Sequence, residues 1–253
     1  MEFVSTQIMG HVCVVTVDRP PVNALNLQLH TEIGKAFMEI SDRNDIYAAV
    51  LRANGKMFMP GNDISTFENP PRSALLREAD ALKNGVGAVY NCRVPVICAV
   101  NGYALGAGLA YAAVCDILIA AQSAKFGLPE VKVGLVGAAG FLSLLIPPKV
   151  VRYMALTGSF LTAEEMMRYG AVHKVVPPDH LMAAVMETAD ELLSCPPLTL
   201  RAWKRAMNLV DNACLGDKFN LEHDFTMEML ETEDFKEAIS AFREKRKPEY
   251  MGK

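Results

Sequence analysis

The sequence has no excess of positive charge, few aromatic residues and no apolar run long enough to cross a bilayer. Its 25 lysines and arginines are outnumbered by 29 aspartates and glutamates, which gives a net charge of −4. Nucleic-acid-binding proteins usually carry a basic stripe, and a membrane-spanning helix needs about 20 consecutive apolar residues. The sequence therefore predicts no nucleic-acid or membrane partner. Anionic small ligands remain compatible with it, because a few placed cations suffice to bind them.

The cysteines form no C-x-x-C pair, and several of the six lie in apolar runs, where a free thiol behaves as a small hydrophobic group. A reducing compartment is the simplest interpretation. The first ten residues, MEFVSTQIMG, lack the apolar core of a signal peptide. We therefore expect a cytoplasmic protein.

Several common catalytic and nucleotide-binding motifs are missing. No phosphate-binding G-x-x-x-x-G-K-[ST] loop and no G-x-S-x-G nucleophile turn occurs. The run from Gly106 to Tyr111 breaks the dinucleotide fingerprint at its last position. The sequence gives little support to a metal site, because its five histidines are dispersed and form no H-x-x-x-H pair: His11, His30, His173, His180 and His223.

The stretch from Pro95 to Ala121 organises the chain. An apolar run, PVICAV, predicts a buried strand that stops at Asn101. A glycine-rich turn at Gly106 then opens an apolar helical segment, and a second buried strand follows. Free backbone N–H groups gather where such a turn begins a helix, and the helix dipole favours negative charge there. The turn can therefore bind a phosphate or stabilise an oxyanion formed during a reaction.

Apolar periodicity and turn residues predict alternating strands and helices up to about residue 140, followed by a helical region. This pattern predicts an α/β protein. The expected strands cover residues 3–10, 12–17, 48–53, 95–100, 116–121 and 172–176. The expected helices cover residues 26–41, 73–92, 148–157, 163–169, 179–193, 197–210, 217–230 and 233–246.

Glu130 is the candidate acid–base residue, since histidine and metal chemistry have little support. It lies in a Gly/Pro-punctuated loop between buried apolar runs, close in sequence to the glycine-rich turn. A carboxylate held there would be partly desolvated, which raises its pKa and suits a general base. The alternative is that Pro129 and Glu130 cap a turn at the surface. The residues by themselves slightly favour this alternative.

Several segments, in order and covering nearly the whole chain, resemble the crotonase family, the enoyl-CoA hydratase/isomerase superfamily. Lys56–Ile64, KMFMPGNDI, resembles the family signature K-x-F-x-A-G-x-D-[IL]. The segment from Pro95 to Asp116 resembles P-V-I-A-A-V-x-G-x-A-x-G-G-G-x-E-L-A-x-x-C-D. Further matches are RPPVNAL at 19–25, FGLPE at 126–130, LTG at 156–158, GAV at 170–172 and FREKR at 242–246.

The resemblance implies a ββα spiral core over residues 1–195 and a helical trimerisation region over residues 196–253 that packs on the core and on neighbouring subunits. It implies a homotrimer or a dimer of trimers, and a coenzyme A thioester as substrate with no further cofactor. The backbone amides of Asn62 and Ala107 would hold the thioester oxygen as an enolate. The residues implied in coenzyme A binding are Arg19, Val22, Ala24, Lys56, Met57, Met59 and Lys245. Lys245 would reach a phosphate of coenzyme A, either within one chain or across a subunit interface.

Two departures from the family pattern bear on the reaction. The resemblance implies that hydratases of the family need two glutamates, one in the glycine-rich helix and one in the P-E loop. Here Ala110 stands at the first position and only Glu130 remains. Moving a double bond needs a single base, so isomerisation is favoured over hydration; Asp63 and Glu68 are poor candidates for a second acid. Ala107 replaces a glycine but retains its N–H. Decarboxylation, thioester hydrolysis and a non-catalytic acyl-CoA-binding trimer remain alternatives.

Overall fold

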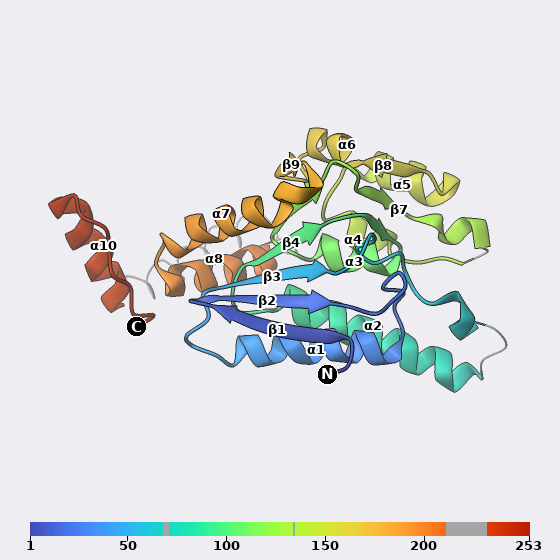
Figure 1. The fold of residues 1–253 in the computed structure, drawn as a ribbon, viewed down its shortest axis with the longest axis horizontal. Coiled ribbons are helices and arrows are strands. Elements are labelled where there is room, and N and C mark those ends of the chain that lie inside the picture. Colours follow the sequence, from blue (N-terminus) through green and yellow to red (C-terminus); the bar gives the residue numbers. More distant parts are fainter. Residues whose placement is uncertain (68–70, 134, 211–231) are drawn as a thin grey trace.

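The structure, a computed structural model, describes residues 1–67, 71–133, 135–210 and 232–253 (Figure 1). Its main sheet has the strand order β1-β2-β3-β4-β6-β9. Neighbouring strands are parallel except for β1 and β2, which form an antiparallel hairpin. The strands are β1 (Val4–Met9), β2 (Val12–Val17), β3 (Ala48–Ala53), β4 (Val96–Val100), β6 (Ile117–Ala121) and β9 (Lys174–Val176).

The first helix, α1 (Leu27–Ser41), forms as its sequence predicts. The side chain of Asn26 caps it by accepting a hydrogen bond from the backbone N–H of Leu29 at 2.9 Å. The apolar positions of this helix recur on one face and are buried against the sheet. The hairpin and α1 together confirm the predicted start of the α/β fold.

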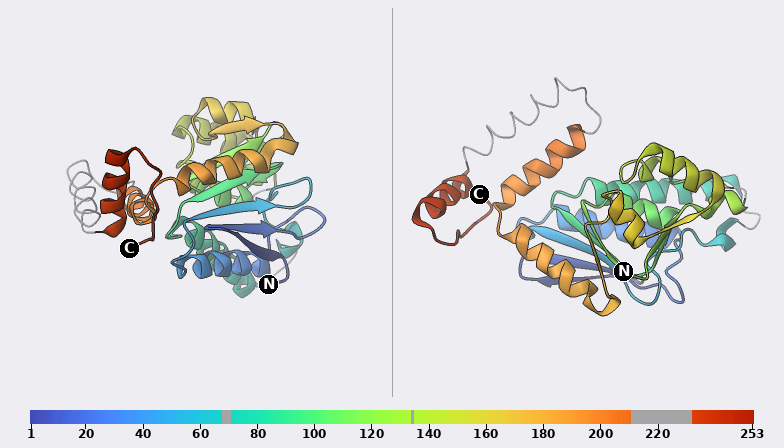
Figure 2. Two further views of the ribbon diagram at one scale, coloured as in Figure 1. Left: turned by 60° about the vertical axis from the view of Figure 1, so that its left-hand side comes forward. Right: turned by 90° about the horizontal axis from the view of Figure 1, so that it is seen from above.

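Helices cover both faces of the main sheet (Figures 1 and 2). On one face α1 packs beside α2 (Arg72–Tyr90), and on the other lies α7 (Leu181–Leu193). Successive residues of a strand point to opposite faces, so Val15 and Val17 join the larger core while Val12 and Val14 pack with the α7 side. Both faces are therefore buried, as expected for strands that read as continuous apolar runs.

A second, three-stranded sheet was not predicted. It has the order β5-β7-β8, formed by β5 (Tyr103–Leu105), β7 (Lys125–Gly127) and β8 (Phe160–Thr162). The Gly/Pro-punctuated loop expected around Glu130 was therefore wrong in part, because residues 125–127 form β7. Strands of three residues are too short for an alternating pattern to register, and glycine and proline next to them signal a turn instead. This small sheet leads directly into α3 (Ala107–Ala113).

The other predicted helices occur in the predicted order, except that the predicted helix 217–230 lies outside the described residues. The short helix over residues 139–142 was not predicted. No described helix is both long and apolar enough to traverse a bilayer. The remaining elements are η1 (Ile64–Phe67), η2 (Pro129–Val133), α4 (Ala139–Leu142), α5 (Pro148–Thr157), α6 (Ala163–Arg168), η3 (Pro178–His180), α8 (Pro197–Val210) and α10 (Glu233–Glu244).

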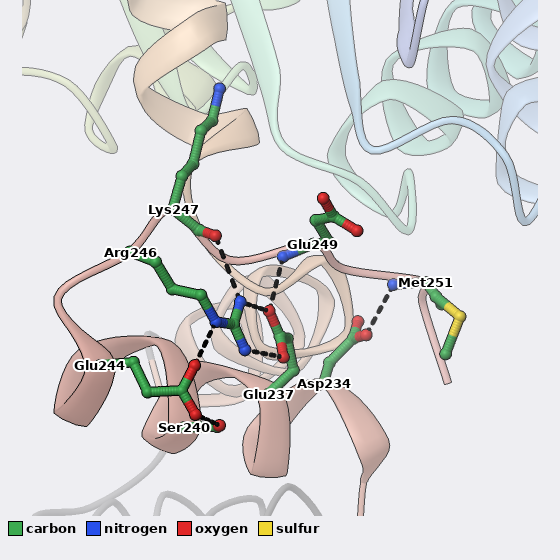
Figure 3. Close-up of polar contacts among 8 residues, drawn as sticks. All are labelled: Asp234, Glu237, Ser240, Glu244, Arg246, Lys247, Glu249 and Met251. Atoms are coloured by element: carbon green, nitrogen blue, oxygen red, sulfur yellow. Dashed lines mark hydrogen bonds and ion pairs between the residues drawn. The ribbon is translucent and has the colours of Figure 1, made fainter.

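The C-terminal tail folds back on α10 (Figure 3). Arg246 forms ion pairs with Glu237 and Glu244. The buried carboxylate of Asp234 accepts hydrogen bonds from the backbone of Met251 and Gly252, at 2.7 and 2.9 Å. Figures 1 and 2 show α10 beyond the end of the sheet at which β2 and β3 begin. The expected domain boundary near residue 195 stays a prediction.

Candidate active site

The candidate site is built around the turn between β5 and α3. Gly106 occupies this turn with a φ of 53°, a conformation that residues with a Cβ rarely adopt. Its N–H donates to the carbonyl of Gly127 at 3.0 Å, which ties the turn to β7. The carbonyl of Gly106 accepts from Ala110 at 3.0 Å and so begins the helix. The predicted glycine-rich helix start is confirmed.

Glu130 lies directly against this turn. A Cβ on Gly106 would overlap the Oε1 atom of Glu130, so the carboxylate occupies the space that the missing side chain leaves. Its Oε2 atom is buried and has no hydrogen-bond partner among the described residues. Burial raises the pKa of Glu130, opposed by a hydrogen bond to its own backbone. The half-buried carboxylate is therefore partly shielded from water at the turn, the environment that suits a general base.

Asn62 is held beside the turn by its chain neighbours. The carbonyl of Gly61 accepts from the N–H of Leu25 at 2.9 Å, and the N–H of Asp63 donates to the carbonyl of Leu25 at 2.7 Å. Within the described residues, the N–H of Asn62 donates no hydrogen bond, and neither does that of Ala107 at the first position of α3. Both amides are thus available to an oxygen of a bound molecule.

The two segments that carry these amides are packed backbone to backbone. Met59 donates to the carbonyl of Tyr103 and accepts from Leu105, both at 3.0 Å. A Cβ on Gly108 would overlap the carbonyl oxygen of Met59, so glycine is required for this close approach. The structure therefore brings Asn62, Ala107 and Glu130 to one place, although they are far apart in the sequence.

Two further carboxylates, Asp63 next to Asn62 in the chain and Glu78 on α2, have opposite electrostatic environments. Asp63 accepts hydrogen bonds from Ser65 and Arg19, which lower its pKa. Glu78 on α2 has one buried carboxylate oxygen with no partner in the described part of the chain. Burial raises the pKa of Glu78, and the negative charge of Asp63 adds to the effect; a backbone hydrogen bond from Leu27 and the charge of Arg19 oppose it. Of these two carboxylates, Glu78 is therefore the one that is suited to hold a proton.

The sequence did not single out Glu78, since it is one of two acidic residues of α2, with Asp80, and lies in no recognisable motif. The sequence named Asp63 and Glu68 as poor candidates for a second acid. Asp63 forms an ion pair with Arg19. Glu68 lies outside the described residues.

The two predicted coenzyme A-binding loops lie side by side. The Asn23 side chain joins them through hydrogen bonds to the carbonyls of Asn54 and Met57, at 2.7 and 3.0 Å. In the first loop, Val22 and Ala24 are half-buried, and Arg19 donates to the carbonyl of Ala24 at 2.6 Å. The hydrogen bonds of Asn23 therefore hold the two loops against each other.

The residues predicted to bind coenzyme A in the second loop differ in their exposure to solvent. Lys56 is exposed and Met57 is half-buried, whereas the side chain of Met59 is fully buried. Lys245 follows α10, at the opposite end of the sheet from α3 (Figure 1). Within one chain, Lys245 therefore does not join the other predicted residues.

A buried polar junction behind Asn62 was not predicted. His30 Nε2 lies 3.2 Å from Asn62 Oδ1, and His30 Nδ1 lies 2.9 Å from the hydroxyl of Tyr111. The only signal in the sequence was a histidine on the apolar face of the first helix, between Leu29 and Ile33. Nothing local in the sequence indicates which residues such a histidine meets.

Comparison with known proteins places the chain in a family. Residues 7–253 match the family model for enoyl-CoA hydratase/isomerase. The chain is 36% identical over 262 residues to an (E)-benzylidenesuccinyl-CoA hydratase of Thauera aromatica, covering 98% of this chain and 99% of the relative. It is 34% identical over 230 residues to a (7aS)-7a-methyl-1,5-dioxo-2,3,5,6,7,7a-hexahydro-1H-indene-carboxyl-CoA hydrolase of Mycobacterium tuberculosis, covering 90% and 93%.

The fold agrees with this family assignment. An enoyl-CoA hydratase crystal structure from Bacillus anthracis superposes with a TM-score of 0.95 at 27% identity, covering 99% of this chain and 100% of the other. The fold and the site define a crotonase-fold acyl-CoA enzyme. The chain belongs to the enoyl-CoA hydratase/isomerase family, and the resemblance noted in its sequence is confirmed.

Proposed function

We propose that this enzyme moves a double bond in an enoyl-CoA, with Glu130 as its single acid–base group. The observation that carries the proposal is the contact of the Glu130 carboxylate with the turn that precedes the Ala107 amide. Ala110, one turn further along α3, offers no second carboxylate. One base that takes a proton from one carbon and returns it to another is sufficient for isomerisation.

In this mechanism Glu130 removes a proton from C2 of a 3-enoyl-CoA. The electrons of the C–H bond move into the thioester, which becomes an enolate conjugated with the original double bond. The N–H groups of Asn62 and Ala107 hold the enolate oxygen, and each such donor contributes on the order of 3 kcal/mol. Glu130, now protonated, returns the proton to C4, so the double bond lies between C2 and C3.

Hydration is the second candidate, and Glu78 favours it. Adding water across a double bond requires handling a water molecule and two protons, for which two carboxyl groups are suited. Glu78 has a raised pKa and an unpartnered oxygen within the described residues, so it is available as a second acid. The relatives' names, a hydratase and a hydrolase, also favour a reaction that uses water.

The test follows the absorbance of the conjugated enoyl thioester with purified protein. A 3-enoyl-CoA should give a rise, and a 2-enoyl-CoA should give no change. Glu130→Gln should reduce the rise by about 10³-fold while acyl-CoA binding persists. Glu39→Gln, at an exposed carboxylate of α1, is the matched control and should keep full turnover.

Other results would redirect the proposal. A fall with the 2-enoyl-CoA would establish hydration, and normal turnover in Glu130→Gln would remove that residue from the mechanism. Binding of a broad panel of acyl-CoA thioesters without turnover would favour a non-catalytic protein. The proposed chemistry needs no cofactor beyond the thioester itself. The coenzyme A contacts, the homotrimer or dimer of trimers and a cytoplasmic location also remain proposals.

A further inference from the structure

In the junction formed by His30, Tyr111 and Asn62, the histidine and the tyrosine are sealed from solvent, whereas Asn62 is half-buried. His30 and Tyr111 both have 0% of their surface exposed. Burying an imidazole and a phenol without hydrogen bonds costs several kcal/mol, so a core retains them only when their polar atoms are paired. Here each ring atom that can form a hydrogen bond has a partner in the junction.

The proton positions in the junction follow from its partners. The amide oxygen of Asn62 is an acceptor, so His30 Nε2 carries the proton and donates to it. His30 Nδ1 is then an acceptor, and the hydroxyl of Tyr111 donates to it at 2.9 Å. Burial lowers the pKa of His30 to about 4, against the opposing hydrogen bond with Asn62, so the imidazole is neutral near pH 7.

Neighbouring helices leave room for this arrangement. A Cβ on Gly85 of α2 would overlap the hydroxyl oxygen of Tyr111 and would lie 2.8 Å from the carbonyl of His30. Helices α1 and α2 therefore close around the tyrosine hydroxyl at a glycine. The rings of His30 and Tyr111 also stack, with centroids 5.8 Å apart.

The junction connects the two candidate oxyanion donors. Tyr111 lies one helical turn after Ala107 on α3, so both belong to the same rigid element. At the other end of the junction, His30 binds the side chain of Asn62, and the backbone N–H of Asn62 is the second donor. We propose that His30 and Tyr111 are positioning residues. Through α1 they fix the backbone N–H of Asn62 relative to the backbone N–H of Ala107.

This inference rests on the proposed function, because it assumes that the two amides bind the thioester oxygen. Positioning acts on the transition state more than on binding of coenzyme A. Variants of the junction should therefore lower kcat and leave KM nearly unchanged. A purely structural role would instead lower the amount of folded protein without changing the properties of the folded fraction.

The experiment uses a cinnamoyl-CoA with a dimethylamino group at the para position. Its absorption moves to longer wavelength when the thioester oxygen is hydrogen-bonded, so it reports on the two amides without any turnover. The full-length protein is titrated with this probe, and kcat and KM are measured separately with the enoyl-CoA that the wild type converts.

We expect His30→Leu to abolish most of the red shift and to lower kcat by 10- to 100-fold, with KM within threefold of the wild type. Tyr111→Phe, which removes one hydroxyl, should lower kcat three- to tenfold and serves if His30→Leu does not fold. His30→Gln places an amide N–H near the position of Nε2 and should restore most of the shift. Thr188→Val, which removes a buried hydroxyl on α7, is the matched control and should change neither quantity.

The outcomes separate the two proposals. A wild-type red shift that persists unchanged in His30→Leu and Tyr111→Phe would overturn the positioning role and leave the proposed function standing. A wild type that binds the probe without a red shift would overturn both. A loss of the shift in both variants, with partial rescue by His30→Gln, would establish the positioning role.

Discussion

The carboxylate of Glu130 occupies the space beside Gly106 that any other residue would fill with its Cβ. The position of Glu130 therefore depends on the absence of a side chain at Gly106, the residue that precedes the Ala107 amide. Gly106 also requires a positive φ, so two independent constraints select glycine at this position.

Gly106→Ala should destabilise the protein and reduce turnover about 100-fold, since the new methyl group displaces Glu130. Gly10→Ala is the control, because Gly10 also has a positive φ, of 62°, but nothing lies within 4 Å of its added Cβ. The control should cost about 1 kcal/mol of stability and no activity. Urea unfolding and steady-state kinetics measure both effects. Equal loss of activity in the two variants would contradict the steric coupling.

Glu78→Gln and Asp63→Asn should differ in their effects on any hydration activity. Glu78 retains a proton more readily than a free glutamate, whereas Asp63 is held ionised by Ser65 and Arg19. Glu78→Gln should lower hydration of a 2-enoyl-CoA at least tenfold and leave isomerisation of a 3-enoyl-CoA within twofold. Asp63→Asn should lower both reactions together, because it loosens the loop that carries Asn62. A Glu78→Gln enzyme with unchanged hydration would remove Glu78 from that reaction.

Folding stability should fall in acid partly because of His30. Its pKa is about 4 in the folded protein and about 6.5 when unfolded, so between these values the unfolded chain binds more protons. The stabilisation is complete above pH 6.5 and is lost as the pH falls toward 4, by about 3 kcal/mol in total. Urea unfolding at several pH values measures this loss. His30→Gln should flatten the profile in this window, whereas His180→Gln, at an exposed histidine, should retain it.

Lys245→Ala tests whether the C-terminal region reaches a neighbouring active site. Lys245 is exposed and follows α10, at the far end of the sheet from α3, so one chain does not bring it to the site (Figure 1). If it contacts a phosphate of coenzyme A across an interface, KM should rise several-fold for the coenzyme A thioester. It should remain unchanged for the matching pantetheine thioester, which lacks the nucleotide. Light scattering should show an unaltered oligomer, and an equal KM for both proteins would exclude the contact.

Local signals in the sequence were sufficient for much of the fold. The β-branched strand over residues 12–17, the helix that begins at Asn26 and the glycine-rich turn each depend on interactions within a few residues, so the sequence predicted them correctly. The small sheet escaped prediction because strands of three residues show no measurable period. Glu130 was identified as a candidate, but its two alternatives remained open until its contact with Gly106 was known.

The sequence by itself determined the family and the order of the main helices and strands, and it singled out Glu130 as the candidate acid–base residue. Only the tertiary structure decided that Asp63 is tied to Arg19, that Glu78 is shielded, and that His30 joins Tyr111 to Asn62. The pKa of a side chain depends on burial and on the charges around it, and these come from segments distant in the chain. Residues 30, 62 and 111 meet because three separate elements pack together, and no local pattern encodes that meeting.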